Sequence, residues 1–110
     1  MRQLRDYAAE KAGHYTLTIG VETFDRDVDK HQLLGPTSEA REVIETAADG
    51  QPGLGLVLAL SHIPLVNESP TQAVEAAGEL LVHAHMGNCL TSDPSHPMYG
   101  DQHPRFGVPG

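Results

Sequence analysis

The sequence predicts an α/β fold in which three parallel strands alternate with helices and a loop follows the last strand. Helix-like and strand-like segments alternate from residue 1 to residue 85, with short connections. Such alternation is typical of βαβ units with right-handed crossovers. The stretch LGLVLAL, residues 54–60, is almost wholly apolar, which predicts a strand buried on both faces, as in a parallel sheet covered by helices. Residues 86–110 are rich in Pro and Gly without periodicity, which predicts a loop.

Three segments have helical patterns. Residues 1–12 carry apolar side chains at helical spacing and are followed by a glycine. The second helix begins after a proline, with Thr37 or Ser38 as its predicted cap. In the third helix Ser69 and Gln72 have the spacing of a capping box, and a proline occupies the first helical position.

Two more strands are predicted, over residues 15–22 and 80–85. Side chains alternate between the two faces of a strand. In the first strand this places Leu17, Ile19 and Val21 opposite Thr18, Gly20 and Glu22. In the last strand it places Leu80, Val82 and Ala84 opposite Leu81, His83 and His85.

Composition narrows the classes of function. A chain of 110 residues is long enough for one domain, and its net charge of −8 disfavours nucleic acid and anionic membranes as partners. The sequence lacks an apolar stretch of the roughly 20 residues that a membrane span needs. The single cysteine, Cys89, excludes an internal disulfide and is interpreted as a packing residue. A cytoplasmic location is therefore expected.

Three ionisable residues are predicted at the C-terminal ends of strands, where α/β proteins bind ligands. They are Glu22, His62 and His85. We expect the side chains of Glu22 and His85 to point toward a common centre from neighbouring strands. A carboxylate and an imidazole suit Mn²⁺, Mg²⁺, Co²⁺ or Zn²⁺. Alternatives remain open for each residue: an exposed glutamate at a strand end, a histidine in a loop or helix cap, or a core histidine bonded to a carbonyl.

Polar side chains are dense in the segment from Gly87 to Gly110. Such a loop directly after a strand end is typical of a lid or a substrate-binding segment, although an ordinary solvated loop would have a similar composition. Arg105 is the best candidate for holding an anionic or hydroxyl-rich substrate, because its guanidinium presents several donors. Asp101 and His103 are further candidates for substrate binding.

The strings VETFDRDVDKHQLLGP, LSHIPLVNE, HAHMGNC and YGDQHPRFG resemble segments of the sugar phosphate isomerase/epimerase family, whose members have a xylose isomerase-like TIM barrel. HAHMGNC and GDQHPRFG are the most specific of these. The resemblance implies that residues 1–110 are a single fragment of a (β/α)8 barrel, from its middle to late β/α units. A full barrel has about 250 residues.

The same resemblance assigns roles to individual residues. It implies that Glu22 is both a metal ligand and the catalytic acid/base group, that His85 is a second metal ligand, and that His62 contacts substrate oxygens. Ala59 stands where the family has an aspartate ligand, and the closing glutamate would lie on a further strand beyond Gly110. With two ligands left, we expect weak or absent metal binding and little or no activity from this chain.

The implied reaction is a 1,2 proton shift through an enediolate on a sugar or sugar phosphate. One alternative is a lyase of the same fold, similar to inosose dehydratase. Another is non-catalytic: a remnant that binds metal or sugar, or an interaction fragment that docks on a complementing barrel half. With either function the chain could assemble as a homo-oligomer or with a complementing barrel half. A DNA-repair endonuclease of the same superfamily is disfavoured by the net charge of −8.

Overall fold

The computed structural model describes residues 1–13 and 16–108 of the chain. The predicted first residue of the first strand, Tyr15, lies outside them. The helices and strands, in chain order, are α1 (Arg2–Ala12), β1 (Ile19–Glu22), α2 (Thr37–Ala48), β2 (Leu54–Ala59), α3 (Pro70–Ala77) and β3 (Leu81–His85). Short 3-10 helices, η1 (Ile63–Val66) and η2 (Gly78–Leu80), flank α3.

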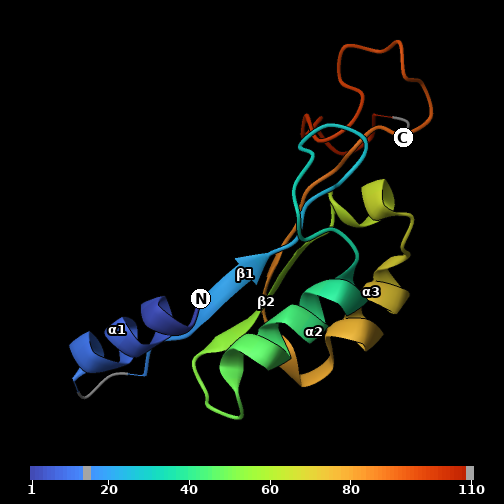
Figure 1. Ribbon diagram of the computed structural model, residues 1–110. Coiled ribbons are helices and arrows are strands. Elements are labelled where there is room, and N and C mark those ends of the chain that lie inside the picture. Colours follow the sequence, from blue (N-terminus) through green and yellow to red (C-terminus); the bar gives the residue numbers. More distant parts are fainter. Residues whose placement is uncertain (14–15, 109–110) are drawn as a thin grey trace.

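The three strands form an open parallel sheet in the order β1-β2-β3. An α/β fold with three parallel strands alternating with helices is therefore confirmed. All six residues of β2 are buried, as its apolar sequence predicts. Both faces of β2 are thus buried, although α2 and α3 lie together on one side of the sheet (Figure 1).

The hydrophobic core lies between the sheet and the pair α2–α3. The side chains of Ile44, Leu56, Ala40, Ala73 and Ala77 are fully buried there. Small alanines on both helices let α2 and α3 approach the sheet closely, while leucines of β2 fill the space between them. This core fixes the position of β2 and, with it, the position of the residues that directly follow the strand.

The predicted alternation of faces in β3 is wrong at its first residues. A bulge shifts the register between β2 and β3, so that Leu56 pairs with Leu81 but Val57 pairs with His83. Leu81 therefore packs against the core, and Val82 joins the opposite, helix-free face. Because His85 pairs with Ala59, His85 also projects from the helix-free face.

The two helix starts differ from each other in how they are capped. Ser69 and Gln72 form the predicted capping box at the start of α3. At α2 the predicted side-chain cap is wrong, because Pro36 is the N-cap residue and Thr37 is already helical. The carboxylate of Glu68 instead accepts hydrogen bonds from the backbone N–H and the hydroxyl of Thr37, at 2.9 and 2.6 Å.

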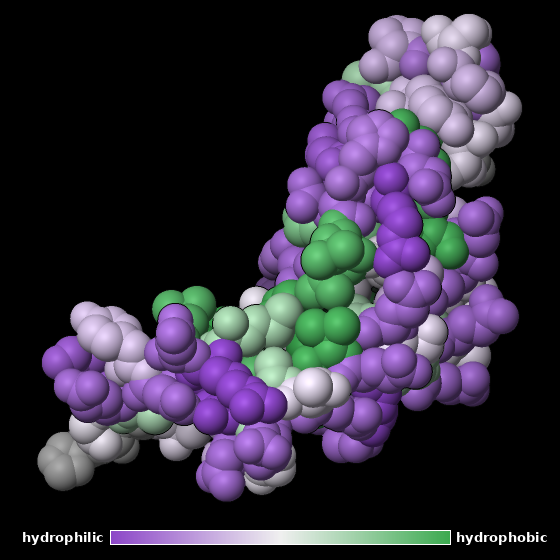
Figure 2. Space-filling view, viewed as in Figure 1, coloured by the Kyte–Doolittle hydropathy of each residue, from purple (hydrophilic) through white to green (hydrophobic). Residues whose placement is uncertain are grey.

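The N-terminal helix α1 extends away from the rest of the molecule (Figure 1). None of its 11 residues is buried. In Figure 2 hydrophobic residues reach the surface in the middle of the molecule, between the α1 arm and the loops at the far end. None of the helices described is long and apolar enough to cross a membrane.

Candidate functional site

The C-terminal ends of the three strands are covered by two loops. The loop between β1 and α2 and the segment after β3 lie side by side beyond these strand ends (Figure 1). The described part of that last segment, residues 86–108, contains no helix or strand, as predicted. Candidate residues from β1, β3 and both loops thus gather in one region, as in other parallel α/β sheets.

Glu22 and His85 meet at this end of the sheet. Oε1 of Glu22 lies 3.0 Å from Nδ1 of His85 and 3.7 Å from Nδ1 of His62. The side chains therefore do converge, but the prediction of neighbouring strands is wrong, since β2 lies between β1 and β3. On β2, Glu22 pairs with Val57 and His85 pairs with Ala59, and neither of these two residues carries a polar side chain.

His62 is the buried centre of the region. It follows β2 by three residues and is 3% exposed. Its Nδ1 lies 2.8 Å from the backbone carbonyl oxygen of Thr23. Because a carbonyl oxygen can only accept, Nδ1 carries a proton. The other ring nitrogen, Nε2, points toward the C-terminal loop, 3.2 Å from Oδ1 of Asp101.

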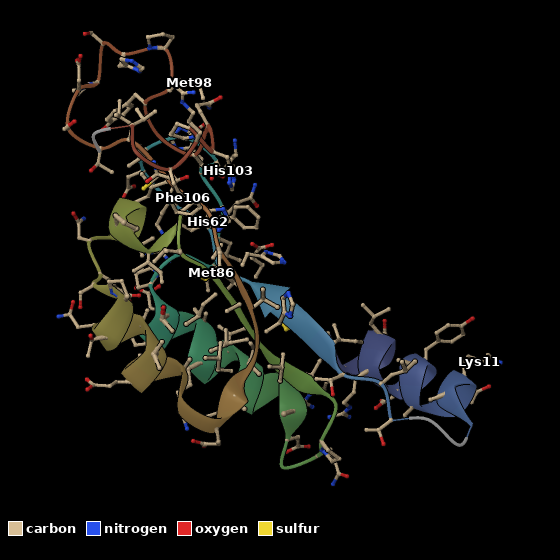
Figure 3. The ribbon with its side chains drawn as sticks, turned by 180° about the vertical axis from the view of Figure 1, so that it is seen from behind. Lys11, His62, Met86, Met98, His103 and Phe106 are labelled. Carbon is tan, nitrogen blue, oxygen red and sulfur yellow. The ribbon has the colours of Figure 1, made fainter. Side chains whose placement is uncertain are left out.

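Asp101 and His103 complete a group of three possible metal ligands. Nε2 of His103 lies 2.8 Å from the same oxygen, Oδ1 of Asp101. One ligand atom from each of the three residues lies within 4.8 Å of the other two. Asp101 is 3% exposed, whereas the His103 side chain is 55% exposed. Figure 3 shows His62 and His103 close together where the strand ends meet the C-terminal loop.

Three polar atoms in this region lack a hydrogen bond to any described residue. They are Oγ of Ser61, Nε2 of His62 and Oδ1 of Asp101, each buried. The two imidazole nitrogens approach Oδ1 of Asp101 closely but without hydrogen-bond geometry. Buried polar atoms are rarely left unpaired, so a group of them is typical of a place where water, an ion or a ligand binds.

The position of Asp101 is set from the loop between β1 and α2. The backbone N–H of Asp101 donates to Oδ2 of Asp29 at 2.9 Å, and the side-chain amide of Gln102 donates to the same oxygen at 2.8 Å. Lys30 Nζ lies 3.8 Å from Oδ2 of Asp101. Gly100 has a φ of 84°, a left-handed conformation that a glycine adopts without strain.

Asp25 organises that loop. Its carboxylate accepts backbone hydrogen bonds from Val28, Asp29 and Lys30 at 2.7, 2.6 and 2.8 Å. Burial acts to raise the pKa of Asp25, but the three N–H donors outweigh it and hold the pKa below its usual value. The ionised Asp25 carboxylate thus fixes the backbone that positions Asp29 and Lys30 beside Asp101.

Arg105 and Cys89, the other candidates in the loop after β3, lie outside this group. Arg105 is exposed, and its backbone carbonyl oxygen accepts a hydrogen bond from the side-chain amide of Asn88 at 3.2 Å. Cys89 is buried, consistent with packing, and burial together with the charge of Asp101 raises its thiol pKa. A pocket of about 270 Å³ adjoins the region, lined by Leu60, Pro64, Gly87, Asn88, Cys89, Thr91 and Phe106.

Sequence reasoning named Asp101, His103 and His62 separately and did not group them as ligands. It missed Asp25, Asp29 and Lys30, although an aspartate that starts a polar loop is a known signal for a turn. In comparisons with known proteins, the chain matched no family model, no curated protein and no solved structure. The family resemblance therefore stays a prediction.

Proposed function

We propose that this chain carries part of the active site of a metal-dependent sugar or sugar phosphate isomerase/epimerase, built on β/α units of a xylose isomerase-like (β/α)8 barrel. The observation that carries the proposal is the 3.0 Å contact between Glu22 Oε1 and His85 Nδ1 at the C-terminal ends of β1 and β3. In such a barrel the helix-free face of the sheet, which bears both residues, would be the interior.

The donor set fits a divalent metal in part. A carboxylate oxygen of Glu22 and a ring nitrogen of His85 are ligands that Mn²⁺, Mg²⁺, Co²⁺ and Zn²⁺ accept. Both side chains remain partly exposed, at 26% and 52%. Ala59, the residue of β2 that pairs with His85, offers no ligand. Two ligands would bind an ion weakly, and any further ligands would have to come from water, substrate or another polypeptide.

Within the reaction, each residue of this chain would have a defined task. The carboxylate of Glu22 would take the proton from the carbon next to the substrate carbonyl. His85 and His62 lie beside Glu22 and would keep that carboxylate oriented. The exposed Arg105, together with His103 and Asp101, would hold substrate oxygens. A metal bound by Glu22 and His85 would supply polarisation of the carbonyl.

A second candidate function is a non-catalytic site that binds a metal or a sugar. Ala59 favours it, because this end of β2, the strand between those of Glu22 and His85, carries no carboxylate. Binding would then need only the Glu22–His85 pair and the polar loop. Both candidates involve the same small-molecule ligand class, and both allow assembly with a second copy or a complementing barrel half.

Turnover and Mn²⁺ binding distinguish the two candidates. Ketohexoses and their phosphates would be incubated with the purified chain, with and without Mn²⁺, and Mn²⁺ affinity would be measured by calorimetry. The variants are Glu22→Gln and His85→Gln, and the control is His83→Gln, an exposed histidine on the same face of β3.

Metal-dependent turnover that is lost in Glu22→Gln and His85→Gln but kept in His83→Gln would support the isomerase. Mn²⁺ binding with the same mutational pattern but without turnover would support the binding site. Mn²⁺ binding that is unchanged in both variants, or absent from the unmodified chain, would refute a metal on Glu22 and His85.

A further inference from the structure

We propose a second site, for a divalent transition metal of the Zn²⁺ type, formed by Nε2 of His62, Nε2 of His103 and Oδ1 of Asp101. The site uses none of the ligands assigned above to the isomerase metal, but its three residues are among those that the proposed function places around the substrate. It joins the end of β2 to the C-terminal loop. Two imidazoles and one carboxylate are a ligand set that Zn²⁺, Co²⁺ and Fe²⁺ accept.

The hydrogen bond of His62 prepares Nε2 as a ligand. Because Nδ1 donates to the carbonyl oxygen of Thr23 at 2.8 Å, a neutral His62 has its lone pair on Nε2. Histidines that bind metals commonly donate their other ring N–H to a backbone carbonyl in this way. That lone pair faces the carboxylate of Asp101 at 3.2 Å, an unfavourable pairing of two acceptors unless a proton or a metal cation lies between them.

The spacing of the three donor atoms suits a small ion. A tetrahedral metal with bonds of about 2.0–2.1 Å holds its ligand atoms about 3.3 Å apart. Oδ1 of Asp101 lies 3.2 Å from Nε2 of His62 and 2.8 Å from Nε2 of His103. Shifts of a few tenths of an ångström around Asp101 would bring these contacts to the required spacing. Three protein ligands would leave a coordination position for water or substrate.

The charges around the site also favour a cation. Oδ1 of Asp101 is buried and has no hydrogen-bond donor among the described residues. Lys30 reaches the other oxygen, Oδ2, at 3.8 Å, and so leaves Oδ1 available. Glu22 adds a second carboxylate 3.7 Å from the His62 ring. A buried carboxylate with one free oxygen is costly unless a positive charge compensates it.

The test is binding of Zn²⁺ and Co²⁺ to the purified 110-residue chain. Asp101→Asn and His103→Gln each remove one ligand, and far-ultraviolet circular dichroism would check that they fold. His96→Gln is the matched control, because His96 is an exposed histidine of the same loop outside the ligand group. We expect each ligand variant to weaken Zn²⁺ binding at least as much as loss of an outer-shell partner does, about 10–100-fold.

Nuclear magnetic resonance of the histidine side chains gives a second readout that does not depend on the variants. Zn²⁺ should shift the Nε2 signals of His62 and His103 and leave the signal of His96 unchanged. Glu22→Gln and His85→Gln should retain this Zn²⁺ site. A result against the Zn²⁺ site can therefore be told apart from a result against the proposed isomerase. Unchanged affinity in Asp101→Asn and His103→Gln, or shifts confined to His83 and His85, would overturn the proposal.

Discussion

Replacement of Asp25 by asparagine tests how the loop between β1 and α2 supports the site. Oδ1 of Asp25 accepts two backbone hydrogen bonds and Oδ2 accepts one. In its better rotamer, the introduced asparagine would place its side-chain oxygen where Oδ1 lies and keep the two hydrogen bonds made there. Because that oxygen is uncharged, each bond would stabilise the fold by about 1 kcal/mol less. Its NH₂ would face the N–H of Lys30, and an unsatisfied N–H costs about 1–3 kcal/mol. The total is about 3–5 kcal/mol.

We expect a measured loss near the lower end, about 3 kcal/mol, because the hydrogen bond of the Lys30 N–H is only partly buried. Urea unfolding followed by circular dichroism would measure it. Asp27→Asn is the matched control, since Asp27 is an exposed aspartate of the same loop, and it should change stability by less than about 0.5 kcal/mol. Equal unfolding midpoints for Asp25→Asn and Asp27→Asn would refute the assigned role of Asp25.

The pH dependence of the same variant follows from the lowered pKa of Asp25. A carboxyl whose pKa is lower in the folded state stabilises the fold fully above its unfolded pKa, about 3.9, and loses that contribution as pH falls through the folded value. The stability difference between the unmodified chain and Asp25→Asn should therefore be constant above a pH of about 5 and shrink below about 4. A difference that grows on acidification would contradict the assignment.

Three further predictions concern single sites. Ser69→Ala should destabilise the chain by about 1 kcal/mol, measured by thermal unfolding, because the capping bond to Gln72 is lost. Gly87→Ala should weaken Zn²⁺ binding in calorimetry, since its Cβ would lie 3.1 Å from Nδ1 of His103; unchanged affinity would contradict this. Cys89 should react with a thiol reagent more slowly in the folded chain at a pH of about 8 than in urea, because burial and Asp101 raise its pKa.

Local patterns predicted much of the fold. The spacing of Ser69 and Gln72 identified the start of α3, and the apolar stretch at residues 54–60 identified the central strand. The bulge in β3 could not be predicted, because it depends on how Val82 packs over Gly55 of β2 and Gly20 of β1. The cap of α2 could not be predicted either, since Glu68 is distant in sequence from Thr37.

The candidate site was predicted only where it lies on regular elements. Glu22 and His85 end strands with recognisable patterns, and parallel strands place their ends at the same edge. Asp101 and His103 lie in a segment without periodicity. There the hydrogen bond from the backbone N–H of Asp101 to the carboxylate of Asp29 determines where Asp101 lies. The bonds from Asp101 and Gln102 to Asp29 join residues 72 and 73 positions apart, and local sequence contains no signal for such long-range pairing.

The attachment of α1 has a consequence for how this chain responds to salt. Arg2 and Arg5 donate to the carbonyl oxygens of Thr46 and Ala48 in the last turn of α2, at 2.8 and 2.5 Å. These guanidinium groups act as a C-terminal cap supplied by another helix, at the negative end of the α2 dipole. Since no residue of α1 is fully buried, raising the ionic strength should detach α1 first and fray the end of α2 with it, while the strands stay paired.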